Sequence, residues 1–266
     1  MNREGQLGFP VPLLGMRPQR LDILLDDGEL LVLAKPQGIL VQADSWYPRL
    51  PVLIEAIRHQ AAGQKPEFVR RNIGEAGLWA VTDLDPELHG PVLFTRTRER
   101  AEELRNALGS GNFRFTFTFL TRTTIGETER TCDLPLARHS RLPRMLVSHT
   151  TGKRCQTRFE LREELGPFHY CTAETVFPRR HQILLHALET GLPVLGDTLY
   201  ARQRPLFLSG MKRDYSPKKD SEERPLYDGP ACFLSELRIP GGLSIEVPKP
   251  PRWTGLIRQL ERHGRG

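Results

Sequence analysis

Four phenylalanines alternate with polar residues in the stretch NFRFTFTFL, which runs from Asn112 to Leu120. The rings fall on one side of an extended chain and the polar side chains on the other. This period of two belongs to a β-strand, since a helix would spread the rings around its axis. The stretch therefore predicts a strand with one face in the core, and we expect at most one ring to reach a cleft.

Strand-like segments outnumber helix-like ones and follow one another in consecutive runs, which indicates an α+β fold with a mixed or antiparallel sheet. Residues 1–20 are predicted to form an irregular N-terminal arm, residues 21–262 one large domain, and residues 202–229 an inserted basic loop within it. The helices are expected around residues 51–62, 97–109, 181–190 and 252–264, with Gly109 and Gly191 as stop signals.

The bulk composition fits a globular protein of one large domain or two small ones, with 38% hydrophobic and 26% charged residues in 266. No apolar run is long enough to span a membrane, and no signal peptide is recognisable at the N-terminus. The four cysteines are scattered, which argues against a zinc ribbon or a disulfide scaffold and fits the cytoplasm. The net charge of +6 favours a polyanionic partner.

The stretch VTDLDPELHG, from Val81 to Gly90, places two carboxylates two residues apart between short strands. Asp83 and Asp85 are open to three interpretations: an exposed acidic turn, a metal-binding or acid/base pair, or a loop that carries a catalytic carboxylate. An isolated Asp-x-Asp-Pro is most often an exposed turn. The surrounding motifs favour the catalytic reading for Asp85 and leave Asp83 as a turn residue.

Four stretches, in order, resemble the RluA-type pseudouridine synthase family. LAKPQGILVQ resembles its K-P-x-G-x-x-V motif, and VTDLDPELHGPVLF resembles H-R-L-D-x-x-T-S-G-L-L-L-F. RRHQILLHALETGLPVLGDTLY resembles R-T-H-Q-I-R-x-H-x-x-x-x-G-x-P-I-x-G-D-x-x-Y, and FLSELRIP with VPKPPRW resembles the closing hairpin. The resemblance covers residues 20 to 261, and the arm before it is too short for an S4-type domain.

The resemblance implies a mixed, mainly antiparallel sheet with flanking helices and a central RNA-binding cleft. It also implies that uridine in RNA is isomerised without a metal or organic cofactor. Asp85 takes the place of the family's catalytic aspartate. Leu184 stands where the family has an arginine. Phe117 stands where it has a tyrosine by strand period, with Phe115 as the alternative register, and we expect Leu184 and Phe117 beside the cleft. Arg180 is a candidate cation to replace the missing arginine near Asp85.

Further candidates for RNA contact are Arg179, Arg180, His181, Lys212 and Arg213, although a basic loop is also commonly just solvated surface. His181 and His186 are five residues apart, a spacing that does not favour a shared metal. We expect an active RNA pseudouridine synthase, monomeric, acting on rRNA or tRNA. The alternative is a catalytically degenerate RNA-binding protein on the same fold; a metal-independent hydrolase using Asp83 and Asp85 is disfavoured by the motifs.

Overall fold

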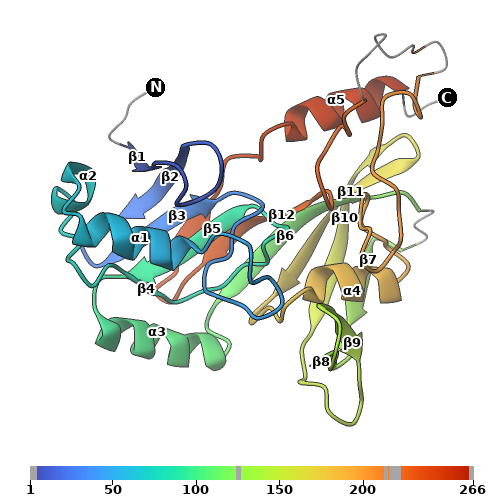
Figure 1. Ribbon diagram of the computed structural model, residues 1–266. Coiled ribbons are helices and arrows are strands. Elements are labelled where there is room, and N and C mark those ends of the chain that lie inside the picture. Colours follow the sequence, from blue (N-terminus) through green and yellow to red (C-terminus); the bar gives the residue numbers. More distant parts are fainter. Residues whose placement is uncertain (1–4, 124–126, 213–214, 216–222, 264–266) are drawn as a thin grey trace. The chain divides into compact units, whose positions relative to one another are not determined.

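A computed structural model describes residues 5–123, 127–212, 215 and 223–263 of the chain (Figure 1). The chain divides into two compact units, where the sequence predicted a single domain from residue 21 to 262. Unit 1 comprises Met1–Phe115 and Leu234–Pro248, and unit 2 comprises Thr116–Phe233 and Lys249–Gly266. The chain passes between the units after Phe115, Phe233 and Pro248, and the first two of these points lie inside strands.

Unit 1 is built on a five-stranded sheet in the order β1-β2-β3-β5-β4, and each described pair in it is antiparallel. Strands β3 and β5 are buried along their whole length, so they form the centre of the core. Helices α1, α2 and α3 belong to the same unit (Figure 1). The elements are β1 (Gln6–Phe9), β2 (Gln19–Asp26), β3 (Leu30–Lys35), α1 (Leu53–Ala62), α2 (Pro66–Val69), β4 (Trp79–Ala80), β5 (Gly90–Thr95) and α3 (Arg98–Gly109).

The N-terminal arm is not irregular throughout, which corrects the prediction for residues 1–20. Strand β1 pairs with β2 from Gln6 opposite Asp22 to Phe9 opposite Gln19. Leu7 and Phe9 are buried, and the Phe9 ring packs edge-on against Phe68 of α2. Two apolar residues among glycines and prolines are too short a pattern to predict a strand, but the pairing with β2 and the contact with α2 stabilise it.

Unit 2 contains most of a six-stranded sheet in the order β13-β12-β6-β11-β10-β7 and a separate two-stranded hairpin, β8-β9. The described pairs are again antiparallel, which confirms the α+β class with a mainly antiparallel sheet. The strand β13 (Ser244–Glu246) and most of β12 (Cys232–Arg238) belong to unit 1. The other elements are β6 (Arg114–Thr121), β7 (Glu129–Cys132), β8 (Leu136–Arg138), β9 (Met145–Val147), β10 (Thr157–Leu165), β11 (Phe168–Thr175), α4 (Gln182–Glu189) and α5 (Trp253–His263).

The phenylalanine stripe lies on β6 and just before it, as its period predicts. All four rings are buried, and Phe119 packs edge-on against Phe159 of β10. Helix α4 ends where Gly191 adopts a positive φ of 74°, a conformation that glycine takes without strain. The described parts of residues 202–229 contain neither helix nor strand. Among the described residues, no helix is both long enough and apolar enough to cross a membrane.

Candidate active site

Asp85 lies in residues 81–89, the segment between β4 and β5, which we call the Asp85 loop. The loop starts extended, and Thr82 Oγ1 accepts a hydrogen bond from the Leu93 N–H at 3.0 Å. The Leu88 N–H donates to the Asp85 carbonyl at 3.0 Å, which closes a turn with Pro86 at its second position. Asp83 is exposed and Asp85 is half-buried, so the two carboxylates have different surroundings.

The Lys35–Gly38 turn, which follows β3, holds the Asp85 loop through backbone carbonyls. Lys35 is fully buried, and its Nζ donates to the Leu88 carbonyl at 2.9 Å. The Gly38 N–H donates to the Pro86 carbonyl at 2.7 Å, and Gln37 Nε2 donates to the Glu87 carbonyl at 2.9 Å. Three consecutive carbonyls after Asp85 are therefore occupied by one turn, which fixes the direction in which the backbone leaves Asp85.

The same lysine also closes its own turn, because Nζ donates to the carbonyls of Pro36 at 3.0 Å and Ile39 at 2.8 Å. A buried ammonium group is tolerated when all its protons are hydrogen-bonded, and here three carbonyls accept them. Gly38 has a φ of 83°, which the turn requires and glycine allows. Lys35 and Gly38 are thus structural, as predicted, and the Lys35 side chain takes part through its own three hydrogen bonds.

Two further side chains attach the Asp85 loop to its surroundings in unit 1. The Tyr47 hydroxyl donates to Glu87 Oε1 at 2.9 Å. His89 Nε2 lies 3.1 Å from the Pro248 carbonyl, and burial of the ring lowers the pKa of His89 below its usual value. A neutral imidazole bonded to a carbonyl through Nε2 carries its proton there. His89 is therefore a structural donor rather than a cation in this loop.

In unit 2, the candidate residues Arg179, Arg180 and His181 lead into α4. The Arg179 guanidinium carbon lies 4.4 Å from the centre of the Phe177 ring, a cation–π distance. The backbone N–H of Arg179 donates to Gln182 Oε1 at 2.8 Å. Arg180 is half-buried. His181 has a positive φ of 52°, and its Nδ1 lies 2.8 Å from the Tyr200 hydroxyl. These contacts fix the entry into the helix.

The residues of α4 point mainly into the core of unit 2. Leu184, at the family's arginine position, is 3% exposed. His186 is buried, and its two ring nitrogens lie 2.9 Å from Thr157 Oγ1 and from the Leu134 carbonyl. Its contacts are those of a structural histidine. Among the described residues, no group of three His, Cys, Asp or Glu side chains is placed to hold a metal ion.

Cys155 lies near this histidine, with Sγ 3.7 Å from His186 Nε2. Such a pair can provide a nucleophile when the thiol is ionised. Here burial raises the pKa of Cys155 to about 11, so the thiol stays protonated near neutral pH. The pair is therefore part of the packing of unit 2 and not a second reactive centre.

The family model for RNA pseudouridylate synthase matches residues 29–189, more than half of the chain. The chain belongs to the RNA pseudouridylate synthase family. This confirms the resemblance drawn from the four motifs. The matched region contains the Lys35–Gly38 turn, the Asp85 loop and α4.

Relatives within the pseudouridylate synthase family are distant in sequence. "Uncharacterized RNA pseudouridine synthase slr1629" of Synechocystis is 26% identical over 189 residues, which are 68% of this chain and 54% of that protein. "Uncharacterized RNA pseudouridine synthase YlyB" of Bacillus subtilis is 22% identical over 253 residues, 93% of this chain and 75% of that protein. "Ribosomal large subunit pseudouridine synthase D" of Yersinia pestis is 27% identical over 186 residues, which are 70% of this chain and 54% of that protein. This chain thus spans about half the length of two of them.

A solved structure shows the same fold. "Human RNA Pseudouridylate Synthase Domain Containing 4" superposes with a TM-score of 0.67 at 16% identity, covering 90% of this chain and 92% of that one. At this identity the likeness concerns the fold, and it supports the α+β architecture of the family.

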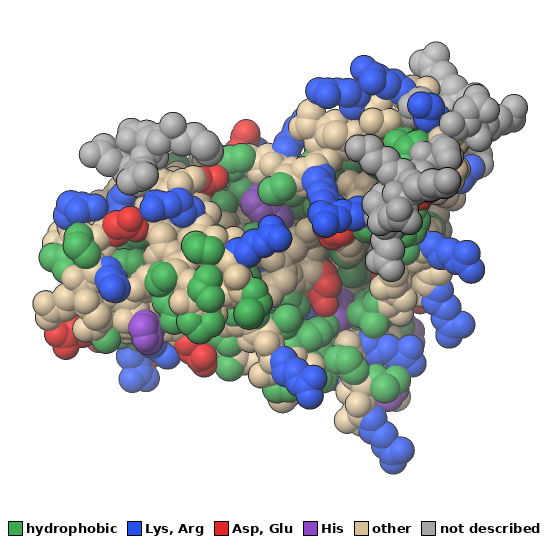
Figure 2. Space-filling model, turned by 45° about the horizontal axis from the view of Figure 1, so that its top comes forward, with side chains coloured by type: hydrophobic (Ala, Val, Ile, Leu, Met, Phe, Trp, Pro, Cys, Tyr) green, Lys and Arg blue, Asp and Glu red, His purple; other side chains and the backbone are tan. Residues whose placement is uncertain are grey.

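The structure also contains a charged segment that the motifs did not single out. Residues 134–159, which include the hairpin β8-β9, carry six arginines and lysines and no aspartate or glutamate. Arg138, Arg141, Lys153 and Arg154 are exposed. Lys and Arg side chains are also spread over the face shown in Figure 2. A plain count of charge along the chain would have found this segment, because the nearest acidic residues lie just outside it.

Of the remaining predicted site residues, Lys212 is exposed and Arg213 lies outside the described residues. Phe117 lies on β6 and is 2% exposed, and its stacking on a base stays a prediction. The roles of Tyr47, Glu87 and His89 were not predicted. Their partners lie 40 residues or more away in the sequence, so no local sequence pattern predicts these roles.

Proposed function

We propose that this chain isomerises uridine to pseudouridine in RNA, with the Asp85 carboxylate as the catalytic group. The single observation that carries the proposal is the set of hydrogen bonds that fixes the Asp85 loop. The carbonyls of Pro86, Glu87 and Leu88 each accept a hydrogen bond from the Lys35–Gly38 turn. A catalytic side chain must be held in one geometry, and backbone hydrogen bonds on its own loop provide this.

The reaction moves one bond and one proton. The bond between N1 of uracil and C1′ of ribose breaks, and a bond between C5 and C1′ forms. C5 gives up its proton, and N1 gains one, so no oxidant, reductant or external group is consumed. The uridine must leave the stacked RNA for a carboxylate to reach it. Asp85 acts in this scheme as nucleophile or as acid/base.

An ionised carboxylate in a closed site requires a positive partner, because burial disfavours its charge. The family's arginine is replaced by Leu184, which carries none. We propose that Arg180 supplies the charge to Asp85 during the reaction. Its place one residue before His181, at the entry into α4, motivates this choice.

The RNA itself is proposed to be rRNA or tRNA, bound through phosphates. The acid-free segment 134–159 offers the strongest support, since exposed arginines and lysines neutralise phosphates irrespective of sequence. Arg179, His181, Lys212 and Arg213 are further candidates for this contact. Binding should therefore weaken steeply as salt concentration rises.

A second function deserves a test because Leu184 is 3% exposed where the family has arginine, and Phe117 has no hydroxyl. The chain would then bind RNA on the pseudouridine synthase fold without modifying it. Both functions predict RNA binding, and they differ only in the product.

The deciding experiment incubates the protein with total rRNA and tRNA and maps pseudouridine. Wild type should form it at defined sites, Asp85→Asn should form none, and Asp83→Asn should stay active because that carboxylate is exposed. If wild type and Asp85→Asn give the same map while both bind RNA, the catalytic proposal fails and the binding function stands.

The role of Arg180 is tested on the site found in this way. Arg180→Met should lower kcat by about 100-fold with little change in KM, the size of effect seen when one charge-stabilising donor is removed. Arg258→Met, an exposed arginine on α5, is the matched control. Equal rates for the two variants would reject Arg180 as the partner of Asp85.

A further inference from the structure

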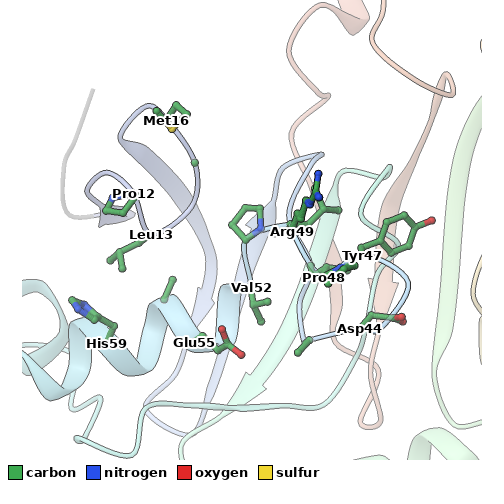
Figure 3. A pocket seen from close by; sticks show the side chains of 16 residues that line it. Pro12, Leu13, Met16, Asp44, Tyr47, Pro48, Arg49, Val52, Glu55 and His59 are labelled. Carbon is green, nitrogen blue, oxygen red and sulfur yellow. The ribbon is translucent and has the colours of Figure 1, made fainter. Parts of the chain in front are cut away.

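A pocket of about 650 Å³ lies in unit 1, behind residues 43–51 (Figure 3). Leu13 and Met16 from the loop between β1 and β2 line one part, and Glu55 and His59 of α1 line another. Its volume is in the range of pockets that bind one small organic ligand. The pocket is therefore large enough for a nucleotide.

The wall formed by residues 41–51 is an ordered loop with closed ends. A parallel bridge joins Leu40 to Val52, with the Leu40 N–H donating to the Pro51 carbonyl at 2.9 Å. The Tyr47 N–H donates to the Asp44 carbonyl at 3.0 Å inside the loop. Compact loops whose ends meet are frequently functional, and this one keeps the pocket preformed.

This loop is joined to the Asp85 loop from two sides. Its tip reaches it through the Tyr47 hydroxyl, which donates to Glu87 Oε1 at 2.9 Å. Its base reaches it through Gly38, two residues before Leu40, whose N–H donates to the Pro86 carbonyl. A ligand in the pocket therefore contacts a loop that is attached at the first and second residues after Asp85.

The lining combines apolar surface with a few polar groups. Prolines and the Met16 side chain, which is 88% exposed, offer apolar surface to a base. Arg49 is exposed at the rim and suits a phosphate. The carboxylates of Asp44 and Glu55 are acceptors, and carboxylates accept hydrogen bonds from the exocyclic amino groups of bases.

We propose that this pocket is a subsite for a single-stranded nucleotide next to the target uridine, with Glu55 selecting a base that carries an exocyclic amino group. Adenine, cytosine and guanine have such a group and uracil has none. The inference rests on RNA being the substrate, as proposed above, and it adds which neighbouring base the chain selects.

The test measures binding of fluorescein-labelled RNA pentamers by anisotropy, using the full chain with Asp85→Ala so that no product forms. The central base is uridine, and one neighbour is varied among the four bases. We expect adenine, cytosine or guanine at one neighbouring position to bind about 5-fold more tightly than uracil. Glu55→Ala should abolish this preference, whereas Glu99→Ala, an exposed glutamate in the first turn of α3, should keep it.

Arg49→Ala should weaken all pentamers equally, as loss of a phosphate contact does. Equal binding of the four bases, a preference unchanged by Glu55→Ala, or no binding of any pentamer would each overturn the subsite. The proposed function fails separately: a Glu55-dependent preference without pseudouridine formation by wild type supports the subsite and rejects the enzyme. Pseudouridine formation by wild type without any base preference supports the enzyme and rejects the subsite.

Discussion

Replacing Lys35 by methionine removes the ammonium group that holds the Asp85 loop and keeps a side chain of similar length. In the native structure, Nζ donates to the carbonyls of Ile39 at 2.8 Å, Leu88 at 2.9 Å and Pro36 at 3.0 Å. The bonds to Ile39 and Leu88 are buried, so water cannot replace the lost donor there without opening the turn.

The expected loss of stability follows from these two carbonyls. An unsatisfied buried acceptor costs about 1–3 kcal/mol, so two of them cost about 2–6 kcal/mol. Methionine recovers part of this, because an ammonium group no longer has to be desolvated. We therefore expect Lys35→Met to lower the free energy of unfolding by about 3 kcal/mol. Lys65→Met, at an exposed lysine of the same unit, should change it by less than about 0.5 kcal/mol.

Urea unfolding followed by tryptophan fluorescence measures the difference, and a pseudouridine assay at a temperature where both variants are folded measures the effect on the loop. Because a displacement of about 1 Å at a reacting group can cost 100-fold in rate, kcat should fall at least about tenfold in Lys35→Met. The reasoning would be refuted if Lys35→Met and Lys65→Met unfolded at the same urea concentration.

Three further perturbations test other parts of the fold. Burial raises the pKa of Asp26, but hydrogen bonds from Arg96 and Arg71 outweigh this and lower it below its usual value, so its contribution is present above about pH 4 and lost below. Asp26→Asn should therefore cost about 2 kcal/mol at pH 7 and less at pH 3, and a gap independent of pH in chemical denaturation would contradict this. Gly90→Ala should cost about 3 kcal/mol in the same assay, because its Cβ would lie 2.6 Å from a β12 side chain and 2.8 Å from a backbone oxygen; wild-type stability would exclude the clash. Burial lowers the pKa of His186, so the unfolded chain binds the proton more readily and stability should fall as pH decreases below about 6.5; His186→Asn should flatten this part of the melting-temperature profile.

Features with a local period were predictable from the sequence. The strand β6 follows from alternating phenylalanines, and α4 follows from its apolar residues and the glycine after it. The Asp85 loop was predictable as a loop, because proline and acidic residues interrupt the short strands on both sides. In each case the signal and the structure lie within about ten residues of each other.

Long-range partners were not predictable. Lys35 was interpreted as part of a turn, yet its bond to Leu88 spans 53 residues. Tyr47 and Glu87 are 40 residues apart, and a surface-like Trp-Tyr-Pro stretch gives no sign of the acceptor it meets. The strand β1 was missed for the same reason, because its partner rather than its composition makes it a strand. A side chain whose partner is set by tertiary packing leaves no period in the sequence.

The way in which the Asp85 loop is held explains how its sequence can diverge. The Lys35–Gly38 turn binds the carbonyls of residues 86, 87 and 88, and every amino acid has that group. These hydrogen bonds therefore set no requirement on the side chains at these positions, as Leu88 in place of the family's threonine illustrates, although Pro86 and Leu88 are also buried. That freedom allows a glutamate at position 87, whose carboxylate reaches Tyr47. The Tyr47–Glu87 hydrogen bond thus adds to the hydrogen bonds that the backbone carbonyls of the Asp85 loop accept, and it joins the pocket behind residues 43–51 to that loop.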